Sequence, residues 1–389
     1  MDRATSLSCA DRVPRRQLAS MESARHLPFG APLGAYDRQA HQLLEGHRAG
    51  AAEAIEIFHQ SHPRFLDPVV TWLPRPISND EIRDTVLTID DARLAVARGY
   101  SFRDWEALTT LFTEAATEGS PVRAFESAAE AVITGDRVAL GTLLRGDPQL
   151  VHARSTRVTC HDPAVHGATL LHYVGANGVE GYRQLSPPNA VAIARMLLDA
   201  GAEPDALAGM YGGQCATLSM LVSSSPPADA GVQVPLLHVL VDYGADLNGA
   251  GASTSWVSPL LTALVFGFRD AALALAARGA RVTELEAAAG LGRAADCAAM
   301  LATATPLSRH RALALAAQLG HTDVVRLLLD AGEDPNRFNP DGYHSQATPL
   351  HQAALAGHLP VVQALVERGA RLDIKAGLWP SWTGLPRRP

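Results

Sequence analysis

Four side chains of types that bind metal lie close together between residues 160 and 172. Cys160 and His161 are adjacent, four residues separate His161 from His166, and five more separate His166 from His172. A structural zinc site needs three or four such thiolate or imidazole ligands converging at bonding distance. The segment therefore supports one hypothesis, a metal-binding or enzymatic protein centred on Cys160, His161 and His166. The competing hypothesis is that these histidines only hydrogen-bond within the fold.

Other chemistry finds no support in the sequence. No serine or cysteine lies in a G-x-S-x-G elbow, the strand-to-helix turn that presents a nucleophile. The glycine-rich stretches GMYGG (209–213) and GAGAS (249–253) lack the lysine and the strand–loop–helix frame of a phosphate site, so they indicate loop tips. We therefore predict no catalytic residue, no metal and no cofactor.

Composition narrows the class of protein further. Of the 389 residues, 47% are hydrophobic but only 5% aromatic, and 33 basic against 40 acidic residues give a net charge of −7. An acidic chain is a poor match for nucleic acid or an anionic membrane. No apolar run has the length of a membrane span, no secretory signal opens the chain, and the four cysteines are far apart. We expect a soluble, cytoplasmic, helix-rich monomer that binds neither nucleic acid nor membrane.

The elements that would position these residues come from an internal repeat. One glycine series follows Leu-rich helical stretches, and a second alternates with it between helical stretches. The first comprises Gly201, Gly244, Gly279, Gly332 and Gly369, and the second Gly135, Gly267, Gly292, Gly320 and Gly357. A glycine directly after a helix is typical of a left-handed C-terminal cap. Each repeat is therefore predicted to be helix, tight turn, helix and loop.

The predicted helices are amphipathic. Val324, Leu327 and Leu328 recur at helical spacing, while Asp323 and Arg326 occupy other faces. Neither helix of a pair can bury its apolar stripe alone, so successive repeats must stack.

These residues carry a family resemblance. ATPLHQAALAGHLPVVQALVERGARLD (347–373) resembles a nearly complete ankyrin repeat, with Thr348-Pro349-Leu350-His351 opening its first helix, and ATLLHYVGANG (168–178) resembles a variant of it. The resemblance implies an all-α ankyrin solenoid that binds other macromolecules and does no chemistry. It also implies that His172 hydrogen-bonds neighbouring turns. His321 and His358, which follow inter-helix glycines, are predicted to bind backbone carbonyls at the turn. About seven repeats are expected: 122–156, 168–208, 216–250, 256–282, 283–305, 309–343 and 347–375.

Two insertions interrupt the repeats, at 173–190 and 223–234. Each contains a Pro-Pro pair, which cannot continue a helix, so both are predicted to be loops. With these insertions the chain is most similar to a group of bacterial ankyrin proteins.

Residues 34–119 are predicted to form a small helical module, which resembles one that precedes the repeats in those bacterial proteins. Its first helix places Tyr36, Ala40, Leu43, Leu44 and His47 on one face. A long loop is expected at 63–88, a helix capped by Asp90 or Asp91 follows, and Ser101 and Asp104 resemble a capping pair. The remaining predictions are a disordered arm at 1–33, the repeat domain at 120–375 and an irregular tail at 376–389. The tail residues Leu378, Trp379 and Trp382 are expected to fold back over the 359–368 helix.

The function predicted from this organisation is a non-enzymatic scaffold that binds an unidentified protein partner through the concave groove and loop tips of the array. Large side chains on the predicted tips are the candidate partner contacts: Met210, Tyr211, Trp256, Phe338, Tyr343 and His344. Packing of these side chains against the neighbouring tip is the alternative. A dedicated regulator or inhibitor of a single enzyme or toxin would use the same surface.

Overall fold

The protein forms two compact units. The computed structural model describes residues 26–28, 30–68, 73–176, 179–210, 213–249 and 258–376. The first compact unit comprises the described residues up to Glu130 together with 154–167 and 179–185, and the second comprises the other described residues from Ala131 onward. The first unit thus continues past the expected domain boundary at residue 120 and takes in two segments from later in the chain. Of the expected arm at 1–33, the structure describes residues 26–28 and 30–33. Of the expected tail at 376–389, it describes only Ala376.

The first compact unit is a small helical bundle. Its elements are α2 (Leu33–Arg48), α3 (Ala52–Ser61), η1 (Pro63–Phe65), α4 (Asn79–Arg83), α5 (Ile89–Gly99), α6 (Trp105–Ala116), the first part of α7 (Pro121–Thr134) and η3 (Gly181–Arg183). Helices α2, α3 and α5 pack on one another around the core. The predicted face of α2 is confirmed, because Tyr36, Ala40, Leu43, Leu44 and His47 are its buried residues.

Three local predictions in this bundle are wrong. The 63–88 segment is not one loop, since η1 and α4 lie in its described part, and α4 begins where Ser78 Oγ accepts the Glu81 N–H at 3.2 Å. Thr88, not Asp90 or Asp91, caps α5 in a reciprocal box with Asp91. Asp104 alone caps α6. In each case a side-chain oxygen three residues before an unpaired helix N–H satisfies that N–H.

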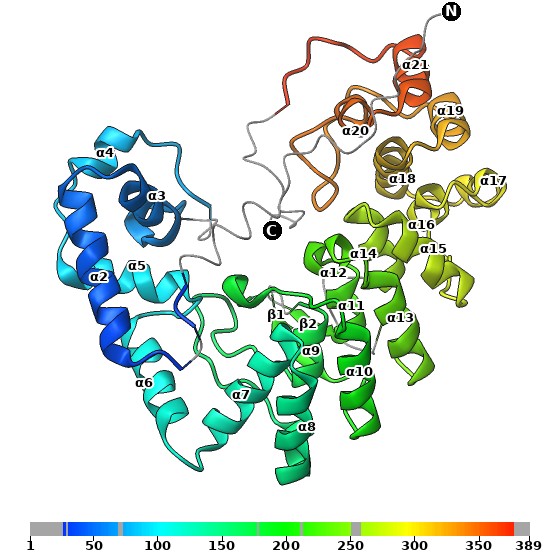
Figure 1. Ribbon diagram of the computed structural model, residues 1–389. Helices are drawn as coiled ribbons and strands as arrows, with labels where there is room; N and C mark the ends of the chain where they lie inside the picture. The colour runs from blue at the N-terminus through cyan, green and yellow to red at the C-terminus, as the bar shows by residue number, and fades with distance from the viewer. Residues whose placement is uncertain are drawn as a thin grey trace, which may run out of the picture. The chain divides into compact units, whose positions relative to one another are not determined.

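The second compact unit is a stack of helix pairs (Figure 1). Its elements are the end of α7, α8 (Arg137–Gly146), η2 (Pro148–His152), α9 (Leu170–Val174), α10 (Ala190–Asp199), β1 (Leu207–Met210), β2 (Gly213–Ala216), α11 (Thr217–Leu221), α12 (Ser225–Asp229), α13 (Gln233–Asp242), α14 (Pro259–Val265), α15 (Arg269–Ala277), α16 (Leu285–Gly290), α17 (Ala294–Leu301), α18 (Pro306–Leu319), α19 (Thr322–Asp330), α20 (Pro349–Leu355) and α21 (Leu359–Glu367). First helices pack on first helices in the order α9, α11, α14, α16, α18 and α20, and second helices such as α17, α19 and α21 form a parallel row. Each repeat therefore covers the apolar face of the one before it.

The sequence prediction is wrong at both insertions and at one tip. The 173–190 insertion, predicted to be a loop, contains the end of α9 and η3. Pro226 and Pro227, predicted to lie in a loop, occupy the first turn of α12. Proline is tolerated there because first-turn N–H groups have no intrahelical partner. Of the GMYGG tip, the described residues Gly209, Met210 and Gly213 belong to the antiparallel pair of β1 and β2, in which Leu207 pairs with Ala216 and Met210 with Gly213. Within the described ranges, no helix is both long enough and apolar enough to cross a bilayer.

Candidate functional site

The residues of the proposed metal site do not form a metal-binding group in the described part of the chain. His166 and Cys160 lie in the first compact unit and His172 in the second. Burial raises the pKa of the Cys160 thiol and lowers the pKa of His161. In the part of the chain that the structure describes, no group of three or more His, Cys, Asp and Glu side chains is placed to hold a metal ion. The three cysteines described there, Cys160, Cys215 and Cys297, are free thiols.

His172 has a structural role in its repeat. Its Nδ1 accepts the Thr169 N–H at 3.2 Å and lies 2.9 Å from Thr169 Oγ1. Because Nδ1 accepts, Nε2 carries the proton and donates to the Cys215 carbonyl at 3.1 Å. His351 repeats the arrangement in the last repeat, where Nδ1 accepts from Thr348 and Nε2 reaches a carbonyl beyond the second helix. The expectation that this histidine hydrogen-bonds turns is confirmed.

The histidines that follow the inter-helix glycines also bind backbone carbonyls, as predicted. His321 Nε2 lies 2.8 Å from the Gly290 carbonyl oxygen, and His358 Nε2 lies 3.0 Å from that of Gln318. Each imidazole therefore ties its repeat to the preceding one.

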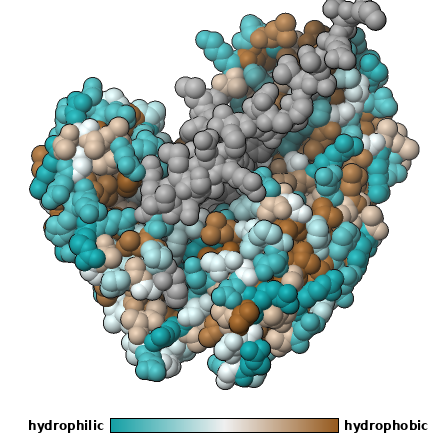
Figure 2. Space-filling model, in the orientation of Figure 1, coloured by the Kyte–Doolittle hydropathy of each residue, from teal (hydrophilic) through white to brown (hydrophobic). Residues whose placement is uncertain are grey.

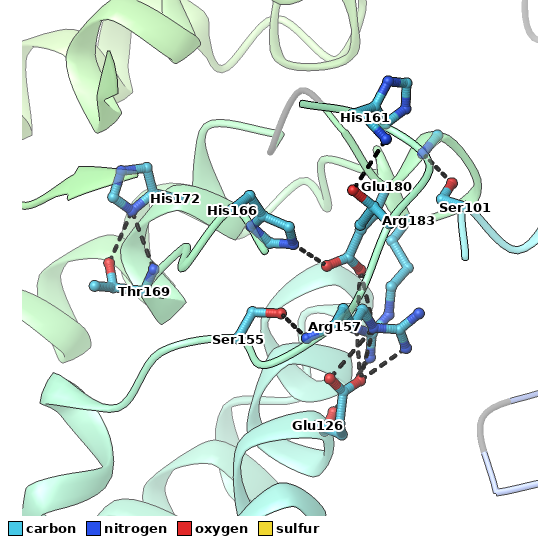
Figure 3. A network of polar contacts seen from close by, with 12 residues as sticks. Ser101, Glu126, Ser155, Arg157, His161, His166, Thr169, His172, Glu180 and Arg183 are labelled. Atoms are coloured by element: carbon cyan, nitrogen blue, oxygen red, sulfur yellow. Dashed lines mark hydrogen bonds and ion pairs between the residues drawn. The ribbon is translucent and has the colours of Figure 1, made fainter. Parts of the chain in front are cut away.

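The largest concentration of buried charge is one that the sequence analysis missed. Two arginines lie between two glutamates in the first compact unit, with a histidine at one end (Figure 3). Glu126 comes from α7, Arg157 and His166 from the 154–167 segment, and Glu180 and Arg183 from the insertion. All five side chains are buried. We call these five residues the ionic network.

Distances within the ionic network are those of charge-assisted hydrogen bonds. Glu126 Oε2 lies 2.8 Å from both Arg157 Nη2 and Arg183 Nη1. Glu180 Oε2 lies 3.2 Å from Arg183 Nη1, and Glu180 Oε1 lies 3.0 Å from His166 Nε2. The two carboxylates thus balance the two guanidinium groups, which is what makes their burial tolerable.

Electrostatics within the ionic network favour the charged forms of Glu180 and Arg157. Burial alone would raise the pKa of Glu180, but Arg157, His166 and Arg183 outweigh it, so this pKa lies far below its usual range. Burial alone would lower the pKa of Arg157, but the Glu126 carboxylate outweighs it, and that pKa is raised. The Arg157 guanidinium carbon also lies 4.8 Å from the centre of the Phe102 ring, a cation–π contact.

The ionic network connects segments that are distant in the chain and is not exposed to a substrate. Both buried carboxylates form ion pairs with guanidinium groups, so their role is to stabilise the fold. Backbone contacts reinforce the connection: the Arg103 N–H donates to the Val158 carbonyl at 3.0 Å, and the Gly181 N–H donates to Ser101 Oγ at 3.1 Å. Ser101, expected to help cap a helix, therefore binds the insertion.

No sequence signal identifies the ionic network. Apart from Glu126 of α7, its members are single charged residues in stretches that resemble ordinary loop, and charged residues in loops are usually exposed. The one hint is that Glu180 and Arg183 lie in an insertion that also contains Tyr182.

The structure separates the predicted tip residues. Met210 and Tyr343 are buried, so neither side chain is exposed for a partner in this structure. Phe338 is 46% exposed, and His344 is half-buried. Tyr211 and Trp256 lie outside the described residues.

Phe338 belongs to the 334–347 loop, which is held to the first helices of the array. The Arg311 guanidinium of α18 lies over the Tyr343 ring at 5.3 Å, and Arg311 Nη1 lies 3.8 Å from Glu286 Oε1 of α16. His344 Nε2 lies 3.4 Å from the Val265 carbonyl at the end of α14. The loop therefore contacts α18 and α14 directly, Arg311 in turn contacts α16, and Phe338 remains 46% exposed.

Comparisons with known proteins agree with this architecture. Residues 285–376 match the family model described as ankyrin repeats (3 copies). Over 61 residues the chain is 43% identical to the ankyrin repeat-containing protein P1E11.10 of Schizosaccharomyces pombe, which corresponds to 16% of this chain and 28% of that protein. Over 73 residues it is 42% identical to the mouse (Mus musculus) ankyrin repeat and SAM domain-containing protein 6, corresponding to 18% and 8% of the two chains. The chain thus spans less than a third of the length of either relative.

Among solved structures, the human ASB11 ankyrin repeat domain is similar over 63% of this chain and 98% of its own, with 21% identity and a TM-score of 0.35. The family match shows that residues 285–376 are ankyrin repeats, and the fold is an all-α ankyrin solenoid with a helical bundle. Ankyrin repeats indicate a protein–protein interaction domain.

Proposed function

We propose that this chain is a non-enzymatic scaffold that binds a protein partner on the loop-bearing side of its repeats, with Phe338 as an anchor. The partner surface is centred on the 334–347 loop and includes Arg311 and His344. We also propose a cytoplasmic location, and the resemblance of the N-terminal bundle and insertions to those of bacterial ankyrin proteins supports a bacterial source.

The observation that carries the proposal is an exposed aromatic side chain on an anchored loop. Truncated aromatic anchors commonly account for about 2 kcal/mol or more of binding free energy. Because contacts to Val265 and Glu286 already restrain the loop and its neighbours, binding would cost little further conformational entropy.

Capture followed by direct measurement tests the proposal. A partner isolated from the native host with the full-length chain is titrated against wild type, Phe338→Ala and Val138→Ala by calorimetry. Val138 is the matched control because it is an exposed apolar residue of α8. We expect Phe338→Ala to weaken binding about 30-fold and Val138→Ala to leave it unchanged. Equal binding by all three proteins, at equal thermal stability, would disprove the Phe338 site.

A dedicated regulator or inhibitor of one enzyme or toxin is the second candidate function. It uses the same surface but requires a single tight partner whose activity falls on binding. Several captured partners sharing the Phe338 requirement would instead support the scaffold.

A further inference from the structure

Residues 339–347, which we call the lid, form a closed loop between α19 and α20 (Figure 1). The Asn339 N–H donates to the Ala347 carbonyl at 2.7 Å and closes the neck of the lid. The Tyr343 ring, 6% exposed, packs against the Arg311 guanidinium of α18. Because Arg311 belongs to the proposed partner surface, the lid covers part of that surface.

The closed lid buries polar groups without giving them partners. Asn339 is 3% exposed, and neither its amide nitrogen nor its carbonyl oxygen has a hydrogen-bond partner among the described residues. The same is true of the buried Nε of Arg311. A polar group that loses water and gains no partner costs free energy. The closed state is therefore penalised at the contact between the lid and α18.

The backbone of the lid is strained as well. His344 has a φ of +62°, a left-handed conformation that a non-glycine residue keeps only when surrounding contacts hold it. Its Nε2 lies 3.4 Å from the Val265 carbonyl oxygen, which is long for a hydrogen bond. This contact holds the lid weakly, so the burial of Tyr343 has to offset both the strain and the missing hydrogen bonds.

The surface that the lid covers is charged. Arg311 Nη1 lies 3.8 Å from Glu286 Oε1 of α16, and Ser308 Oγ hydrogen-bonds the same glutamate. Apolar residues on the visible face of the array lie instead near α11 and α13 (Figure 2). Closing the lid takes water from a charged pair, which further weakens the closed state.

We propose that the lid is autoinhibitory: it opens in solution, and the protein partner binds the open form, in which Arg311 and Glu286 are uncovered. This inference rests on the proposed function and adds a regulatory step to it. Phe338 lies directly before the lid. Asn336 holds that side of the loop, because its Nδ2 donates to the Gly369 carbonyl at 3.0 Å and its Oδ1 accepts the Arg371 N–H at 2.8 Å. The Phe338 anchor therefore keeps its place whether the lid is open or closed.

Hydrogen exchange on the full-length chain without partner tests the opening. The Tyr343 and Ala347 amides report on it, because they donate within the lid to the Pro340 and His344 carbonyls at 2.9 and 3.0 Å. Asn339→Leu replaces an unpartnered amide by an apolar side chain of similar size. We expect exchange of both amides to slow about tenfold. Unchanged or faster exchange overturns the proposal, because it shows that the native amide does not oppose closure.

A matched control is the same substitution at a paired asparagine. Asn189 Nδ2 donates to the Gly135 carbonyl at 2.8 Å, so Asn189→Leu removes a hydrogen bond. We expect faster exchange in α10, which follows Asn189, and no change in the lid. Tyr343→Ala is the opposing variant, since it removes the ring that holds the lid closed and should speed exchange of the Ala347 amide.

Calorimetry with the partner isolated as above tests the inhibition. Asn339→Leu should weaken binding about tenfold, because the binding-competent open form is populated tenfold less. Tyr343→Ala should strengthen binding by the factor by which its exchange speeds. Binding that is unchanged in either variant, or weakened in both, overturns the autoinhibitory lid.

The two proposals fail in different ways. If Phe338→Ala binds as wild type does while Asn339→Leu and Tyr343→Ala still change affinity in opposite directions, the Phe338 site is wrong and the lid is retained. If Phe338→Ala weakens binding but the two lid variants bind as wild type does, the Phe338 site is retained and the lid is wrong.

Discussion

Arg157 Nη2 and Glu126 Oε2 lie 2.8 Å apart, and each side chain is 1% exposed. The pair joins α7 to a segment 31 residues further along the chain, and Arg183 reaches the same carboxylate across 57 residues. This carboxylate is the point at which three separate parts of the chain meet in the first compact unit.

Removing one partner of this pair should be strongly destabilising. Arg157→Met leaves the Glu126 carboxylate with one guanidinium partner fewer in a buried place, and we expect a loss of about 3 kcal/mol or more in the free energy of unfolding. Urea denaturation measures it. The exposed pair Arg371–Asp373 provides the control, since Arg371→Met should leave the transition unchanged. The double variant Glu126→Gln/Arg157→Met should lose less than the two single losses added together, because it leaves no uncompensated charge. Strict additivity would contradict the network.

Glu180 should make stability depend on acid pH. Its pKa is lowered in the folded state, so its contribution is complete above the unfolded-state value of about 4.3 and is lost as the pH falls towards the folded-state pKa. Glu180→Gln lacks this titration. The difference in melting temperature between wild type and Glu180→Gln should therefore be constant from pH 7 to pH 5 and shrink below about pH 4.3. If the difference in melting temperature instead grows as the pH falls, the pKa of Glu180 is raised, not lowered, in the folded state.

Gly332 and Gly320, one glycine from each series, should respond differently to alanine. Gly332 has a φ of +93° with open space around its missing side chain, so Gly332→Ala should cost about 1 kcal/mol from backbone strain alone. Gly320 has a φ of +85°, and a Cβ there would lie 2.8 Å from the His358 ring, so Gly320→Ala should cost more. Thermal unfolding measures both. Combining Gly320→Ala with His358→Ala should remove the excess, and an undiminished excess would exclude the steric cause.

His172 should stabilise its repeat without binding metal. His172→Ala leaves the Thr169 N–H and the Cys215 carbonyl without their partner in a buried setting, and we expect a loss of about 2 kcal/mol. Denaturation in the presence and absence of a chelator measures it. If the chelator lowers the stability of the wild type by as much as His172→Ala does, the zinc hypothesis would be supported instead.

The sequence by itself determined the repeat array. The glycine series, the apolar stripes and the Thr348–His351 motif predict helix pairs and their stacking because caps, turns and amphipathic faces depend on residues only a few positions apart. The hydrogen-bonding roles of His172, His321 and His358 followed from the same register. Short-range rules failed at Pro226. Proline cannot continue a helix but is tolerated in its first turn, and the sequence alone did not indicate that a helix starts at this proline pair.

Only the tertiary structure decided which charged and aromatic side chains outside the regular helices are buried. Arg157 and Glu180 occur in stretches that resemble solvent-exposed loop, and their burial depends on a partner brought from another part of the chain. Phe338 and Tyr343 are both aromatic residues of one loop, yet one is exposed and the other lies beneath Arg311. Burial of a charged or aromatic side chain depends on what folds against it, and that contact is long-range, so no spacing within the sequence encodes it.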